Sequence, residues 1–230
     1  MTKDYTFSFA LESYILHPER FPKEVLYYDS HASIVHDGFP KSSFHILVLP
    51  RDLDLTLHNP NIALTSSTKR KYEKYIRICS DYIFHEFNKL YRLNPVNISD
   101  NPWFNSVGEI RNKRLFFKNF IQVGIHSVPS MSNLHIHVLT KDFNNEKLKR
   151  KRHFNSFNTD FFVKWENLPL AHAPLDEKKQ EIYYNRNHHL ICNYCHDNFK
   201  DDFGDFKKHI TQEFEKYFIR IGPQFAIKQL

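Results

Sequence analysis

The segment Asn133–Leu139 constrains the fold more than any other stretch of this 230-residue sequence. Its residues alternate between polar and apolar with a period of two, which predicts a β-strand with two different faces. The apolar residues, predicted to face the core, are Leu134, Ile136 and Val138. The polar residues on the opposite face are Asn133, His135 and His137. The sequence therefore predicts a sheet with two imidazoles side by side on one face.

This pair of imidazoles suits the chemistry of phosphate esters. A neutral imidazole can attack phosphorus, and a protonated neighbour can stabilise the developing charge. The same spacing also fits two metal ligands, or two exposed histidines in a chain that has 15 of them. A metal site needs a third ligand on the same face, and Asn133 is a poor one. Spacing alone leaves these interpretations open.

The remaining periodicity predicts an α+β fold. β-rich runs predict strands within 25–36, 44–49, 116–126 and 134–139, with a turn at 37–40 and a loop over 94–105. Helical spacing predicts a short helix over 7–16 and a long one over 69–91. Candidate N-caps for the long helix are Ser66, Ser67 and Thr68.

Composition narrows the class of protein. Hydrophobic residues make up 41% of the chain, enough for a core, and no apolar run reaches the length of a membrane span. The N-terminus lacks the layout of a secretory signal, so we expect the cytosol or the nucleus. A net charge of +6 permits an anionic partner such as nucleic acid without requiring one.

The C-terminal cysteines predict a zinc site. Cys192 and Cys195 are followed by apolar Phe199 and Phe206 and by His209, close to the spacing of a zinc finger. Glu213 lies four residues further, on the same helix face as His209. We expect a structural Zn²⁺ held by these two cysteines, His209 and Glu213, with His196 or water as the alternative fourth ligand. Redox chemistry is disfavoured because no βαβ pattern surrounds the pair.

The stretch Gly124–Val138 resembles the signature of the histidine-triad superfamily, H-φ-H-φ-H-φ-φ, and more narrowly that of the aprataxins. The similarity continues through Lys141–Phe143 and His153–Thr159, and backwards to Phe39–Lys41 and His45–Pro50. It implies an antiparallel sheet with packed helices. The domains it implies are a histidine-triad catalytic domain at 1–165, a linker at 166–187 and a small zinc finger at 188–230.

The resemblance also implies an activity, the hydrolysis of DNA 5′-adenylates. AMP would be removed from abortive ligation intermediates through a covalent AMP-histidine, in DNA single-strand break repair. The implied catalytic residues are the nucleophile His135, then His137, His126 and Ser130, which contact the phosphate. The implied nucleotide-binding residues are Asp37, Lys41 and His45. One departure is Asn133, which stands where the family has the first triad histidine; an amide can still donate and accept hydrogen bonds.

DNA contact is expected from a basic run and from two aromatics. Candidates in the run are Lys149, Lys151, Arg152 and His153, although a charge run is also typical of a solvated face or a nuclear import signal. The resemblance makes Phe7 and Phe9 candidates for stacking on the exposed base pair at a DNA end, and a core position is the alternative. On the finger helix, the candidates for phosphate contact are Lys207 and Lys208.

The expected partners are DNA with adenylated 5′ ends and the product AMP. No membrane partner is expected. We expect a nuclear monomer, with the cytoplasm as a second compartment. One alternative is a small-molecule histidine-triad nucleotide hydrolase, against which the finger and the basic run argue. Another is a non-catalytic DNA-binding zinc-finger protein, which only Asn133 favours.

Overall fold

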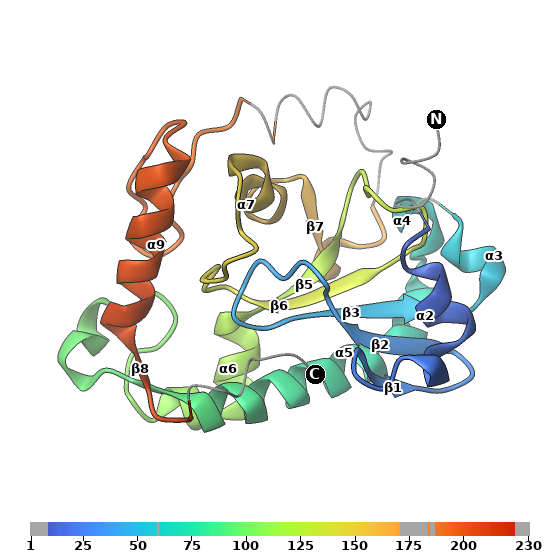
Figure 1. The fold of residues 1–230 in the computed structure, drawn as a ribbon, viewed down its shortest axis with the longest axis horizontal. Coiled ribbons are helices and arrows are strands. Elements are labelled where there is room, and N and C mark those ends of the chain that lie inside the picture. The colour runs from blue at the N-terminus through green and yellow to red at the C-terminus, as the bar shows by residue number, and fades with distance from the viewer. Residues whose placement is uncertain (1–8, 59, 171–183, 185–186, 224–230) are drawn as a thin grey trace.

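The computed structural model describes residues 9–58, 60–170, 184 and 187–223. Its central element is a six-stranded antiparallel sheet in the order β1-β2-β3-β6-β5-β7 (Figure 1). The strands are β1 (Val25–Tyr28), β2 (Ala32–His36), β3 (His45–Pro50), β5 (Ile121–His126), β6 (Ile136–Thr140) and β7 (Phe162–Lys164). A second sheet pairs β4 (Tyr91–Leu93) with β8 (Phe218–Arg220). The α+β class predicted from the sequence is confirmed.

Helices surround this sheet. The α-helices are α2 (Glu12–Leu16), α3 (Leu53–Thr56), α4 (Pro60–Ala63), α5 (Ser66–Leu90), α6 (Lys113–Phe120), α7 (Lys151–Asn158) and α9 (Phe203–Tyr217). The 3₁₀-helices are η1 (Pro18–Arg20), η2 (Pro95–Asp100), η3 (Glu109–Arg111) and η4 (Trp165–Asn167). None of the described helices combines the length and the apolar character that a membrane span requires.

The long helix α5 covers one face of the sheet, at the bottom of the view in Figure 1. Its buried side chains recur at helical spacing and include Tyr72, Tyr75, Cys79, Ile83 and Phe87. They share one core with the sheet residues Ile34, Ile46, Val48, Ile136 and Val138. The predicted core face of the histidine strand is therefore confirmed.

Two element boundaries correct the sequence prediction. The N-cap of α5 is Thr65, whose extended backbone lets its hydroxyl accept from the Thr68 N–H, so the three predicted caps lie inside the helix. Strand β6 begins two residues later than predicted, because the Leu134 N–H donates to the Thr56 carbonyl at 2.6 Å.

The largest correction concerns residues 116–126, predicted as one strand. The first part belongs to α6, which Asn112 caps by accepting from the Leu115 N–H. Phe116 and Phe120 lie one turn apart and are both fully buried. The strand starts only at Ile121. Residues 94–105, predicted as a loop, contain η2. Within the predicted helix 7–16, the described helix is Glu12–Leu16, and residues 7–8 lie outside the described residues.

The sheet face opposite α5 has two parts. At one end, α2 covers an apolar cluster of Leu11, Ile15, Val35, Leu47 and Leu49. At the other end the buried side chains are histidines, and Phe157 of α7 packs on them. Gly124 makes room there: a Cβ on it would come within 2.3 Å of the Val163 carbonyl oxygen in β7. The close approach of β7 therefore packs Phe162 beside the histidines.

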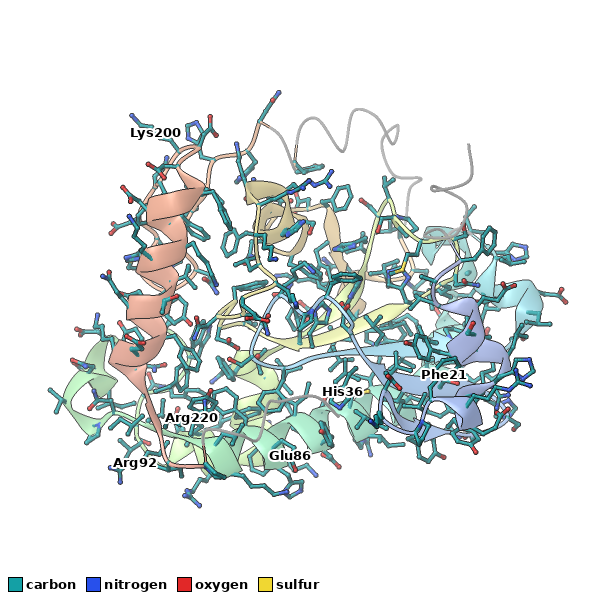
Figure 2. The ribbon with its side chains drawn as sticks, in the orientation of Figure 1. Phe21, His36, Glu86, Arg92, Lys200 and Arg220 are labelled. Carbon is teal, nitrogen blue, oxygen red and sulfur yellow. The ribbon has the colours of Figure 1, made fainter. Side chains whose placement is uncertain are left out.

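The C-terminal segment packs onto the main core. Side chains from the cysteine loop and α9 belong to the same cluster as α5 and the sheet: Leu190, Cys192, Tyr194, Phe206, Ile210, Phe214, Tyr217 and Phe218. Helix α9 stands at one end of the sheet in Figure 1, and Figure 2 shows Arg92 and Arg220 on the strands that join it to α5. The predicted linker 166–187 falls largely outside the described residues, so its limits stay a prediction.

Candidate active site and zinc centre

Four histidines meet on the sheet face away from α5. His45 starts β3, His126 ends β5, His135 directly precedes β6 and His137 lies within it. The His137 ring centroid lies 4.6 Å from that of His126, 4.8 Å from that of His135 and 5.1 Å from that of His45. His45, His135 and His137 are buried and His126 is half-buried, and burial lowers the pKa of each. The structure thus brings together His126, His135 and His137, as predicted.

The orientation of His135 is set by its own backbone neighbour. Its Nδ1 lies 2.7 Å from the Asn133 carbonyl oxygen. A carbonyl can only accept, so Nδ1 carries the hydrogen and, in the neutral ring, the lone pair is on Nε2. Burial lowers the pKa of His135, which keeps the ring neutral near pH 7. His135 therefore presents a fixed, unprotonated nitrogen.

A second chain of contacts supports His137. Asp37 Oδ2 lies 3.3 Å from His45 Nδ1, and His45 Nε2 lies 2.9 Å from His137 Nδ1. The Lys41 backbone N–H also donates to His45 Nδ1, at 3.3 Å, so the proton positions on the His45 and His137 rings depend on which partner this nitrogen takes. The outer nitrogen of His137 is Nε2. That nitrogen and His126 Nε2 are buried and have no hydrogen-bond partner among the described residues. Two such nitrogens beside His135 suit phosphate oxygens, whose negative charge favours protonated imidazoles.

The loop between β2 and β3 (37–44), here named the nucleotide loop after its predicted nucleotide-binding residues, carries Asp37 and Lys41. The Lys41 ammonium contacts the Phe39 carbonyl, and burial lowers the pKa of Lys41 while the charge of Asp37 acts in the opposite direction. His45, predicted to line the nucleotide pocket, has a fully buried side chain behind His137. Its direct contact with a nucleotide stays a prediction; the geometry gives it a supporting role. Ser130 is exposed on the loop that follows β5.

Sequence reasoning missed the part played by Phe157. Its ring centroid lies 4.5 Å from that of His126 and 5.1 Å from that of His137, the latter at 90°. An aromatic wall of this kind excludes water and fixes ring orientation. The signal in the sequence was the S-F-N-T element, of which Phe157 is the aromatic residue.

The candidate DNA contacts divide into outward and inward side chains. Lys149, Arg152 and Lys208 are exposed. Lys151 is largely buried and pairs with Asp201, and Lys207 donates to the Asn145 carbonyl at 2.9 Å, so neither ammonium points outward. Both ammonium groups have protein partners in this structure, and their contacts with phosphate stay a prediction.

The other predicted DNA contacts are His153 and the two aromatics. The pKa of His153 is lowered to about 4 by burial, with a further contribution from the charge of Lys41, which places the basic run beside the nucleotide loop. Phe9 is partly buried, and Phe7 lies outside the described residues.

Three residues of the predicted zinc site converge: Cys192, Cys195 and His209. His209 Nε2 lies 3.2 Å from the sulfur of Cys192 and 3.2 Å from that of Cys195. All three atoms lie within 4.8 Å of one another, as ligands do around an ion with bonds of roughly 2.0–2.3 Å. Two thiols and an imidazole are the donors that Zn²⁺ prefers. The site lies in the C-terminal finger, apart from the histidines on the sheet, and its structural role stays a prediction.

Glu213, the predicted fourth ligand, is not part of the cluster of donor atoms within 4.8 Å, so its role stays a prediction. One of its carboxylate oxygens, Oε2, is buried and has no hydrogen-bond partner among the described residues, with Lys216 Nζ 3.9 Å away. We expect Glu213→Gln to weaken zinc binding by about tenfold or more, since an amide oxygen is a weaker ligand than a carboxylate. Competition with a chromophoric chelator measures this. Glu215→Gln, on the exposed side of α9, is the matched control. Equal zinc affinity in both variants would show that a group other than Glu213 is the fourth zinc ligand.

The buried histidines predict a pH-dependent stability. The pKa of His45 is lowered to about 4 by burial, against roughly 6.5 in the unfolded chain. The unfolded state therefore binds more protons, and stability that is present above pH 6.5 is lost as the pH falls. We expect His45 alone to cost about 2 kcal/mol between pH 7.5 and 5. Urea unfolding at both values measures it: His45→Gln should show a shallower pH dependence than the wild type, and exposed His31→Gln the same dependence.

Two family models and several known proteins match this chain. The family model of the HIT domain matches residues 19–144, and that of the C2HE / C2H2 / C2HC zinc-binding finger matches residues 158–216. An aprataxin-like protein of Saccharomyces cerevisiae is 41% identical over 91% of this chain and 97% of its own length. An aprataxin-like protein of Schizosaccharomyces pombe is 31% identical over 90% of this chain and 81% of its own length.

Solved structures of a relative have a similar fold. The crystal structure of the aprataxin ortholog Hnt3 in complex with DNA superposes with a TM-score of 0.72 at 30% identity, covering 91% of this chain and 95% of that chain. A structure of Hnt3 with DNA and guanosine gives a TM-score of 0.63 at 28% identity, over 91% of this chain and 96% of that chain. The chain belongs to the aprataxin-like family, in which a HIT domain is joined to a C-terminal zinc-binding finger.

Proposed function

We propose that this protein is a DNA 5′-adenylate hydrolase, which removes AMP from abortive ligation intermediates during DNA single-strand break repair. The observation that carries the proposal is the state of His135. Its Nδ1 is bonded to the Asn133 carbonyl, so Nε2 offers a lone pair beside the buried nitrogens of His126 and His137. This arrangement suits nucleophilic attack on phosphorus.

The reaction has two displacements. In the first, His135 Nε2 attacks the α-phosphorus of the adenylate, a P–N bond forms, and the bond to the oxygen of the DNA 5′-phosphate breaks. The DNA leaves with its 5′-phosphate. In the second, a water oxygen attacks the same phosphorus, the P–N bond breaks, and AMP is released as the water proton is taken up by the site. The intermediate is a covalent AMP-histidine.

The neighbouring side chains have separate tasks. His137, held by His45 and Asp37, binds and polarises the phosphate oxygens. His126 lies on the other side of His137 and contacts the phosphate near the leaving group. Ser130 donates to the phosphate, and Lys41 and Asp37 bind the nucleotide. Asn133 replaces a triad histidine, but the nucleophile depends on its backbone carbonyl, which any residue supplies.

The finger and the basic run support DNA as the substrate. Exposed Lys149 and Arg152 lie beside the nucleotide loop, and Lys208 is exposed on α9. They can contact phosphates without reading bases, as repair at arbitrary sites requires. Structures of the relative Hnt3 contain DNA. We also propose a nuclear location, where the DNA substrate is found. We propose a monomer, because the finger supplies an additional DNA-binding surface within the same chain.

A nicked duplex that carries a 5′-adenylate tests the proposal, with diadenosine tetraphosphate as the competing substrate. AMP release is followed on a gel for the zinc-loaded full chain. Faster turnover of the adenylated DNA supports the proposal. Faster turnover of the dinucleotide would leave a small-molecule histidine-triad hydrolase, and no turnover of either substrate would leave a DNA-binding protein.

A further inference from the structure

Residues 141–145, here named the bridging segment, connect the zinc centre to the nucleotide loop. The segment follows the catalytic strand β6 directly. On one side it contacts the residues between Lys41 and His45, and on the other it contacts the neighbours of the zinc ligands. The proposed hydrolysis uses neither set of contacts.

The contacts toward the nucleotide loop centre on Asp142. Its Oδ2 accepts from the Ser43 N–H at 2.9 Å and from the Ser43 hydroxyl at 2.7 Å. Asn145 adds a bond from its amide to the Ser42 carbonyl at 3.1 Å. Lys41 precedes these serines and His45 follows them by two residues, so the bridging segment fixes the backbone on which both stand.

The contacts toward the finger come from residues beside the zinc ligands. The Tyr194 hydroxyl, between the two cysteines in sequence, donates to the Asp142 carbonyl at 2.8 Å. Asn193, from the same loop, donates to the Lys141 carbonyl. From α9, Lys207 donates to the Asn145 carbonyl at 2.9 Å. Zinc held by Cys192, Cys195 and His209 would tie this loop to α9 and so would also order the groups that hold the bridging segment.

The bridging segment is itself strained. Phe143 has a φ of 47° and is fully buried, a conformation that bulky residues rarely adopt. Asp142 is fully buried, and its second oxygen, Oδ1, has no hydrogen-bond partner among the described residues. Strain of this kind persists only where surrounding contacts determine the conformation from several sides. Here those contacts come from the nucleotide loop and from the finger.

We propose that Asp142 is a positioning residue that couples zinc binding to nucleotide binding. Its carboxylate fixes the nucleotide loop, and the zinc-loaded finger fixes Asp142. Because such coupling is reciprocal, AMP must tighten zinc binding by the same factor by which zinc tightens AMP binding. The inference rests on the nucleotide-binding part of the proposed function, and its turnover part also rests on the proposed hydrolysis.

The experiment compares variants of the zinc-loaded full chain by calorimetric titration with AMP. Asp142→Ala and Ser43→Ala should each weaken AMP binding by about tenfold, as expected for lost hydrogen bonds to a charged group. Asp142→Asn keeps one acceptor oxygen and should restore most of the affinity. Ser80→Ala is the matched control, since its hydroxyl bonds only within α5. With adenylated DNA, KM should rise while kcat changes little.

A second measurement follows zinc by competition with a chromophoric chelator, with and without saturating AMP. In the wild type, AMP should tighten zinc binding by about fivefold or more. In Tyr194→Phe, which keeps both cysteines, this factor should fall toward one. Ser43→Ala and Tyr194→Phe decide the matter if Asp142→Ala does not fold.

Three results would overturn the inference: AMP affinity in Ser43→Ala equal to the wild type, zinc affinity in the wild type independent of AMP, or no AMP binding by the wild type. If the wild type binds AMP but releases none from adenylated DNA, the proposed function fails, and the zinc measurement still decides the coupling.

Discussion

Replacing His135 with alanine is expected to lower kcat for AMP release from adenylated DNA by about 10⁴-fold or more, as for other covalent nucleophiles. The reason is that Nε2 of this ring is the atom oriented for attack, through the bond from Nδ1 to the Asn133 carbonyl. DNA affinity should stay within about twofold, since the exposed cations lie elsewhere. Single-turnover kinetics and a fluorescence anisotropy titration measure the two quantities separately.

The control for this loss is His85→Ala, which removes an exposed imidazole from α5 and should leave turnover unchanged. Acid-quenched wild-type enzyme should also carry covalent AMP, detected by mass spectrometry, and His135→Ala should carry none. Turnover of the variant at the wild-type rate would show that another group attacks the phosphorus.

Removing zinc is expected to lower the melting temperature of the whole chain by about 10 °C. Free zinc at 1,000 times its Kd contributes about 4 kcal/mol to the folded state, and about 1 kcal/mol moves Tm by 2–4 °C in a chain of this size. The melt should remain a single transition, because Cys192, Phe206 and Phe214 belong to the same core as α5 and the sheet. Calorimetry with and without a chelator measures both features.

Two cysteine variants separate zinc from packing. Cys192→Ser should melt early and show no further shift with chelator. Cys79→Ser alters a fully buried cysteine of the main core, far in sequence from the zinc site, and should lose some stability while keeping the chelator response. Two separate transitions in zinc-loaded wild type would instead show that the finger unfolds independently.

The sequence alone predicted the parts of this protein that depend on local periodicity and spacing. The period-two pattern around His135 places its imidazole and that of His137 on one face, because side chains alternate along any strand. The spacing of Cys192, Cys195 and His209 brings three ligands together, because loop and helix geometry are fixed over so few residues. The α+β class and the long helix α5 also depended on such patterns.

Tertiary structure decided what local patterns could not. The aromatic run at Phe116 suited a strand or a helix, and burial of Phe116 with Phe120 on one helical face, together with the Asn112 cap, selected the helix. His45 contacts His137 across 92 positions of the chain. Asp142 contacts Ser43 across 99 positions. Contacts at such separations depend on the pairing of strands and the packing of helices on them, and no local period of the sequence encodes either.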